Sequence, residues 1–208
     1  MRYNRREQEG NHITMRIRIG LITTLAALLI AASSGIVAQE QQDKKGPPGP
    51  PPGMKLTSTG WKDGGDMAAK YTCLGEPNPV SPGLDWTNAP KGTQSYAVVM
   101  HDPDFTRDKG TTDILLWMVW NLPGDSTHLA EGMKEGFEQG SIRQGNNVRN
   151  EHVYRGPCAS GTSHHFTLEL FALDETLNLP ATATRADLYK VMEGHVLGKG
   201  VTVGLFHR

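Results

Sequence analysis

The chain has 208 residues, a formal net charge of −1 and 37% hydrophobic residues. This length suits about one domain, and the composition is that of an ordinary soluble protein. Because neither basic nor acidic residues are in excess, the charge balance gives no indication of a nucleic-acid partner, and we expect none.

The first forty residues differ from the rest of the chain. Two arginines precede an apolar run over 19–30, and small residues then lead to Ala38. This order predicts a signal peptide over residues 1–38, with Met15 as an alternative start, and a secreted or periplasmic protein. The apolar run is short for a membrane-spanning helix, so we expect no stable span after cleavage; an uncleaved anchor is the alternative.

A Pro/Gly-rich segment follows the predicted cleavage site and contains GPPGPPPG at residues 46–53. Two such units are too few for a collagen triple helix, so we interpret residues 39–53 as an extended linker. The folded domain is then 54–208, long enough to bury roughly two thirds of its unfolded surface. Without residues 1–38 the chain keeps 16 basic and 20 acidic residues and is mildly acidic.

Four segments of the domain have the features of β-strands. They cover residues 95–100, 114–122, 165–173 and 201–207 and are rich in aromatic or β-branched residues between turn-forming ones. The third alternates apolar and polar residues, which is typical of a half-exposed strand. The second, ILLWMVWNL, is apolar on both parities, which indicates a central strand covered on both faces.

One helix is expected before the last strand. Thr184 can cap its N-terminus, Asp187 follows at the capping-box position, and Gly194 can end the helix. Many strands with Gly/Pro turns and one late helix predict a mainly β fold, an antiparallel β-sandwich with a peripheral C-terminal helix.

The sequence HDPDF ends the first of these strands and carries two carboxylates, Asp102 and Asp104. On an extended backbone these two point to one side, whereas His101 points to the other and is expected to pack on the sheet. A solvated turn explains each residue singly, since Asp and Pro favour turns. A binding site would explain the combination, although too few oxygen ligands follow for calcium.

A Gly/Pro-rich loop, GPCASGTS at 156–163, runs directly into the strand that contains His164 and His165. Backbone N–H groups in such a loop can form an anion-binding concavity, and His164 can add a donor. The loop lacks the lysine of a P-loop and leads to a strand rather than a helix. Adjacent strand residues face opposite sides, so we do not expect the two histidines to bind one metal.

Five motifs follow one another within residues 55–208: TCLGEPNPVSPGLDW, APKGTQSYAVVMHDPDF, LLWMVWNLPG, YRGPCASGTSHHFTLELFALD and DLYKVMEGHVLGKG. In this order they resemble the phosphatidylethanolamine-binding protein family, also called the Raf kinase inhibitor protein family, and especially its bacterial branch. The resemblance implies a β-sandwich with a C-terminal helix and a small pocket for phosphate groups such as phosphoethanolamine.

The resemblance also implies an anion-binding set drawn from three segments: Asp102, Asp104, Gly156, Pro157 and His164. Two pocket-lining positions depart from the family pattern, because Leu116 stands where a histidine is usual and Phe166 where a tyrosine is usual. Each change removes a donor, which is expected to weaken phosphate binding.

Asp102 needs a role compatible with an anionic ligand. A carboxylate 4 Å from a phosphate would cost about 4 kcal/mol at an effective dielectric of 20. We therefore expect Asp102 to be protonated, to orient a histidine or to accept the amine of a headgroup.

Cys73 and Cys158 are the two cysteines of the chain. Both flank motifs that the resemblance brings near the pocket, and an exported chain meets an oxidising compartment, so one expectation is a disulfide. Two buried thiols are the alternative.

Three functions are open on these observations. The first is a secreted, non-enzymatic protein that binds a small phosphorylated or anionic ligand such as a phospholipid headgroup and modulates an unidentified protein partner. The second is a protein-interaction or inhibitor module with a vestigial pocket. The third, a metal-dependent hydrolase, is disfavoured because the motifs supply no ligand set with an open metal position. No GxSxG elbow occurs, and neither Ser160 nor Cys158 has a partner that the sequence identifies, so we do not expect an enzyme. We also expect no cofactor.

Overall fold

A computed structural model describes residues 53–106 and 109–208. The predicted signal peptide over 1–38 and all but the last residue of the predicted linker over 39–53 lie outside this part of the chain. Within it, no helix combines the length and the apolar character needed to cross a membrane.

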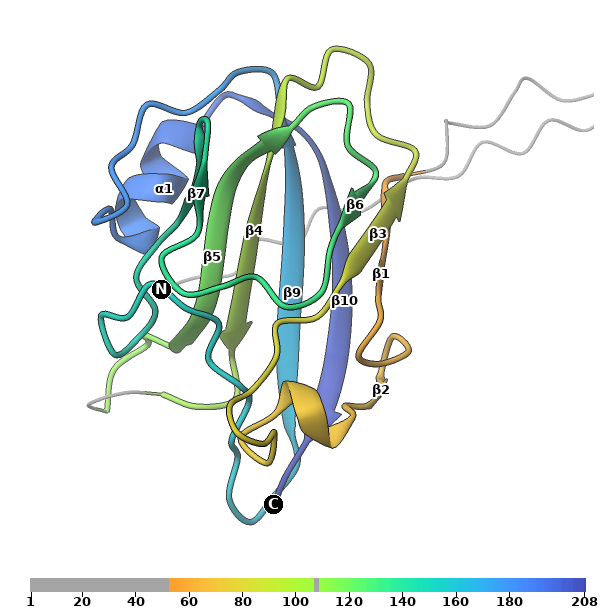
Figure 1. Cartoon of the computed structure of the whole chain (residues 1–208), viewed down its shortest axis with the longest axis vertical. Helices are drawn as coiled ribbons and strands as arrows, with labels where there is room; N and C mark the ends of the chain where they lie inside the picture. The colour runs from red at the N-terminus through yellow and green to blue at the C-terminus, as the bar shows by residue number, and fades with distance from the viewer. Residues whose placement is uncertain (1–52, 107–108) are drawn as a thin grey trace, which may run out of the picture. The chain divides into compact units, whose positions relative to one another are not determined.

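Strands dominate the described residues (Figure 1), and most belong to one seven-stranded sheet of order β2-β10-β9-β4-β5-β8-β7. Its long members are β4 (Ser95–Asp102), β5 (Ile114–Pro123), β9 (His164–Leu173) and β10 (Val196–Phe206). Its short members are β2 (Gly65–Asp66), β7 (Glu138–Gln139) and β8 (Ile142–Gln144). All neighbours are antiparallel except β2 and β10, which are parallel.

A second, three-stranded antiparallel sheet of order β1-β3-β6 covers one face of the larger sheet. It consists of β1 (Lys55–Ser58), β3 (Leu84–Thr87) and β6 (His128–Leu129). The helix α1 (Arg185–Met192) packs on the opposite face. The mainly β sandwich with one peripheral helix is therefore confirmed.

The four predicted strands correspond to the four long strands, and their hydrophobic patterns explain their places. In β5, Trp117 and Val119 enter the core between the two sheets, whereas Met118 and Trp120 enter the core under α1. A strand whose two faces each pack against a hydrophobic core is apolar at odd and even positions alike. In β9, by contrast, the apolar residues at every second position are buried and most of the intervening ones are only partly buried.

The helix begins as the sequence predicts. Thr184 is its N-cap, the Thr184 hydroxyl accepts the backbone N–H of Asp187, and the Asp187 carboxylate accepts the backbone N–H of Thr184. After the C-cap residue Glu193, Gly194 takes a φ of 87°, which favours glycine.

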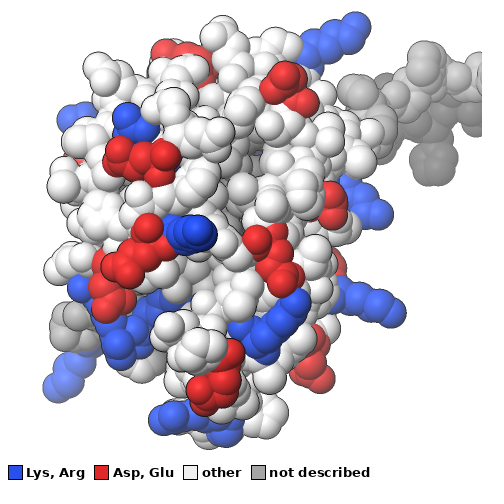
Figure 2. All heavy atoms as spheres, viewed as in Figure 1, with Lys and Arg blue, Asp and Glu red and all other residues white. Residues whose placement is uncertain are grey.

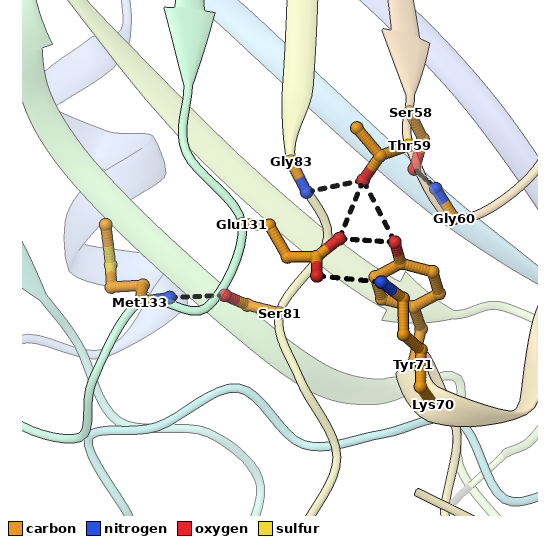
Figure 3. A network of polar contacts seen from close by, with 9 residues as sticks. All are labelled: Ser58, Thr59, Gly60, Lys70, Tyr71, Ser81, Gly83, Glu131 and Met133. Atoms are coloured by element: carbon orange, nitrogen blue, oxygen red, sulfur yellow. Dashed lines mark hydrogen bonds and ion pairs between the residues drawn. The ribbon is translucent and has the colours of Figure 1, made fainter.

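A polar network ties the small sheet to the short 3₁₀ turn η1 (Ala69–Tyr71) and is drawn in Figure 3. The Glu131 carboxylate accepts hydrogen bonds from the Tyr71 hydroxyl and from Lys70 Nζ, the latter at 2.8 Å. These two donors hold the pKa of the Glu131 carboxyl below its usual range. The Thr59 hydroxyl accepts the Gly83 N–H at 2.9 Å, which joins the strand ends to the same network.

Candidate functional site

Three neighbouring strands of the larger sheet have their ends close together. Because β4 is antiparallel to both β5 and β9, the end of β4 at Asp102 lies beside the start of β5 at Ile114 and the start of β9 at His164. These strand ends lie at the lower end of the sheet in Figure 1. A cavity of about 530 Å³ opens here.

The cavity is lined by the strand ends and by the loop that precedes β9. The charged and polar lining residues are Asp102, Arg149, Arg155, Ser160 and His164. The remaining lining residues are Phe105, Ile114, Leu116, Val148, Gly156, Cys158, Ala159 and Phe166.

Asp102 and His164 form the polar centre of the lining. Oδ2 of Asp102 lies 2.8 Å from Nδ1 of His164, and Oδ1 accepts the backbone N–H of Asp104 at 3.1 Å. Asp102 is only 6% exposed, so its carboxylate is held inside the protein. Of the three roles expected for Asp102, this geometry fits orientation of a histidine, which leaves the imidazole Nε2 as the ring nitrogen without a partner among the described residues.

Asp104 does not line the cavity. The strand β4 ends at Asp102 and the chain turns at Pro103, so the expectation that Asp102 and Asp104 face the same side is wrong. Oδ2 of Asp104 instead accepts the backbone N–H of His165 at 2.7 Å and lies 2.7 Å from Nδ1 of the same residue. Hydrogen bonding to His165 holds the pKa of the Asp104 carboxyl below its usual range.

The neighbouring histidines are separated as the strand alternation predicts. His164 pairs with Asp102 inside the cavity, whereas His165 pairs with Asp104 on the exposed side. Among the described residues, no three or more His, Cys, Asp or Glu side chains are grouped so that they could hold a metal ion.

The predicted anion-binding loop contributes Gly156 but not Pro157 to the lining. A Cβ at Gly156 would lie 2.7 Å from the carbonyl carbon of Thr72, so only glycine fits this approach of two backbones. The Pro157 carbonyl accepts the backbone N–H of Cys73 at 3.0 Å, and Cys73 is joined to Cys158 by a disulfide. The wall of the cavity is therefore covalently attached to a segment 85 residues away in sequence.

Leu116 and Phe166 both reach the cavity and give it an apolar floor. They are 3% and 1% exposed, and the Phe166 ring stacks on the imidazole of His164 with centroids 6.2 Å apart. The two positions at which the sequence departs from the family pattern thus lie together, next to the oriented histidine.

Sequence reasoning missed two arginines of this site, Arg149 and Arg155, and one aromatic residue, Phe105. Arg149 and Arg155 line the cavity, and neither forms an ion pair with a carboxylate of the described residues. Burial lowers the pKa of the Arg155 guanidinium, and the nearby charge of Arg149 lowers it further. Both arginines precede the GP motif in RNEHVYRGP, but basic residues in a loop are too common to identify a site.

His101 lies away from the cavity, as the strand alternation predicts. Its Nδ1 is 2.5 Å from Oδ2 of Asp113, and Arg185 of α1 pairs with the same carboxylate. Burial tends to raise the pKa of Asp113, but hydrogen bonds from Arg185 and His101 outweigh it and hold the pKa below its usual range. This cluster attaches the helix to the sheet.

The charges on the face drawn in Figure 2 are mixed. Acidic and basic side chains are interspersed, and no broad area of one sign is visible there.

The fold and this cavity define a class: two packed sheets with a small cavity at one end of the long strands of the larger sheet. The chain belongs to the phosphatidylethanolamine-binding protein family, because the sequence model of that family matches residues 57–207. A UPF0098 protein of Methanothermobacter thermautotrophicus is 36% identical over 157 residues, which cover 74% of this chain and 99% of that protein.

Solved structures agree with this assignment. A phosphatidylethanolamine-binding protein homologue from Chlamydia trachomatis superposes with a TM-score of 0.67 at 28% identity, covering 75% of this chain and 98% of its own. The Escherichia coli protein YbcL superposes with a TM-score of 0.66 and covers 76% of this chain and 99% of its own; at 21% identity it supports the fold alone.

Proposed function

We propose that the protein binds a small organic anion in the cavity at the end of the sheet, phosphorylated headgroups included, and that it does so without catalysing a reaction. The observation that carries this proposal is the charge of the lining. Two guanidinium groups and an oriented imidazole face one cavity, and the single lining carboxylate among the described residues is already engaged.

The geometry removes the difficulty that a carboxylate poses for anion binding. Asp102 is paired with His164, and a protonated imidazole at His164 would offset the charge of Asp102 and leave its Nε2–H to donate to an anion. An anion near Arg149 and Arg155 would also relieve the repulsion between these two like charges. Charge-assisted hydrogen bonds of this kind contribute about 1.5 to 3 kcal/mol each.

The lack of an activated nucleophile in the described lining supports a binding protein rather than an enzyme. Cys158 is oxidised in the disulfide, and the Ser160 hydroxyl contacts the Arg208 guanidinium at 3.4 Å rather than a base. Nucleophilic catalysis requires a base within hydrogen-bond distance of the attacking group.

Export is part of the proposal and rests on the signal-like order of residues 1–38 and on the disulfide, which persists in oxidising compartments. In that setting the domain binds its ligand outside the cytoplasm, and ligand binding modulates a protein partner. An interaction module whose pocket has lost its ligand is the second candidate function, favoured by the apolar side chains of Leu116 and Phe166 in the cavity floor.

Calorimetric titration with inorganic phosphate and phosphoethanolamine separates these two functions. We expect measurable binding, and a loss of about tenfold to a hundredfold in the His164→Ala variant, which removes one charge-assisted donor. His128→Ala is the matched control, because His128 also pairs with an aspartate through Nδ1 but lies outside the cavity. Absence of binding to both anions would favour the interaction module.

A further inference from the structure

The lining of the cavity contains both charged and apolar side chains, and this combination bears on which anions fit. The inference drawn from it rests on the proposed function. Arg149, Arg155 and His164 provide positive or polar groups, whereas Ile114, Leu116 and Phe166 provide hydrocarbon. A ligand that fills the cavity must therefore place apolar atoms directly beside its charged group.

The apolar part of the lining also includes Phe105. This side chain is 47% exposed, although an aromatic residue of its size is normally covered. A ligand lying between Phe105 and Phe166 would remove apolar surface of both the ligand and Phe105 from water. Full burial of a phenyl-sized group contributes a factor of about ten to a hundred in affinity.

The described lining offers a positively charged ligand group one carboxylate, and that carboxylate is already engaged. Asp102 is the one carboxylate in the described lining, and its two oxygens already accept from His164 and from a backbone N–H. The two guanidinium groups would moreover repel an ammonium group placed in the cavity. A zwitterion such as phosphoethanolamine thus loses the apolar contacts and gains only an already engaged carboxylate as a partner for its amine.

The size of the cavity exceeds the need of a bare phosphate or sulfate ion. At about 530 Å³ it falls in the range of clefts that enclose ligands of drug-like size. A tetrahedral ion alone would leave the apolar floor in contact with water, which is unfavourable.

We propose that this cavity selects amphiphilic organic anions, in which an aromatic or branched alkyl group is attached directly to the anionic head, over zwitterionic headgroups. The head lies between the two arginines and His164, and the hydrocarbon lies against Leu116, Phe166 and Phe105. Leu116, Phe166 and Phe105 are then the residues that determine specificity, and Arg149 and Arg155 determine that the ligand is an anion.

A matched ligand series tests this selectivity on the full exported chain. Phenyl phosphate, phosphoethanolamine and inorganic phosphate share a phosphate head and differ in what is attached to it; benzoate and acetate repeat the comparison with a carboxylate head. By calorimetry we expect phenyl phosphate to bind about tenfold or more tightly than phosphoethanolamine and inorganic phosphate, and benzoate to exceed acetate similarly.

Phe105→Ser tests the apolar part of the lining without disturbing a core, because Phe105 is exposed. It should reduce the preference for phenyl phosphate severalfold and leave inorganic phosphate unchanged. Leu197→Ser is the matched control, since Leu197 is 39% exposed and does not line the cavity.

The outcomes are distinguishable. Two results would overturn the selectivity and leave the proposed anion site intact. One is binding of phosphoethanolamine that is as tight as that of phenyl phosphate or tighter. The other is a preference for phenyl phosphate that Leu197→Ser reduces as much as Phe105→Ser does. Failure of every anion in the series to bind would overturn the proposed function, and the selectivity with it.

Discussion

The disulfide between Cys73 and Cys158 should stabilise the domain strongly, and its removal is the most quantitative perturbation that the structure offers. The bridge closes a loop across 85 positions. In the chain-entropy treatment, a disulfide that closes a loop of this length lowers the conformational entropy of the unfolded chain. This stabilises the folded state by about 4.5 kcal/mol. Domains of this size are stable by about 5 to 15 kcal/mol, so loss of the bridge removes a third of the stability or more.

Urea unfolding followed by circular dichroism, with and without a thiol reductant, measures this contribution. The expected result is a decrease of about 2 to 5 kcal/mol in the free energy of unfolding on reduction. The Cys73→Ala, Cys158→Ala double variant is the control, because it should start at the lower stability and show no response to the reductant. Two free thiols in freshly exported protein, or a stability that changes by less than about 0.5 kcal/mol on reduction, would refute the reasoning.

Three further predictions concern single residues. Gly156→Ala should destabilise the domain by about 1 to 3 kcal/mol in urea unfolding, since the new Cβ meets backbone at 2.7 Å, whereas Gly53→Ala, with nothing within 4 Å, should be neutral. Because the pKa of Asp104 is lowered in the folded state, its ionised carboxylate stabilises the fold above pH 3.8, and this stabilisation is lost as the pH falls through the lower, folded-state pKa. Asp104→Asn should therefore reduce the acid-dependent loss in the free energy of unfolding measured over a pH series. The same pH dependence in the variant and the parent would contradict the account. Leu116→His should tighten phosphoethanolamine binding about tenfold, because it adds a donor to the cavity floor; a variant destabilised by about 1 to 3 kcal/mol without tighter binding would instead show that the imidazole is buried unpaired.

The sequence predicts the long elements well because each has a strong physical signature. The stretch from Ile114 to Leu122 is apolar at odd and even positions alike, which fits a strand covered on both faces, and the capping box at Thr184 marks the start of the helix. The short strands β1, β2, β3, β6, β7 and β8 have two to four residues, too few for a period to be recognised. They exist because the fold brings backbone groups from distant parts of the chain together as partners, which is a property of the folded chain.

The site is predicted less completely, for reasons visible in particular residues. Asp102 and His164 were identified through motifs, but their contact depends on antiparallel pairing that brings positions 62 apart together. The position of Asp104 could not be predicted, because the expectation assumed an extended backbone where the chain turns. Arg149 and Arg155 carry no pattern of their own, and only the folded loop reveals that both face the cavity.

The most direct test of the central claim is an NMR titration of isotopically labelled protein with phenyl phosphate. If the anion binds at the end of the sheet, the backbone amide signals of Gly156, Ser160 and His164 shift in a saturable manner, and those of Glu193 and Gly194, beside the separate groove between α1 and β10, stay unchanged. Shifts confined to the groove at α1, or no saturable shift at any of the lining residues, would contradict the account.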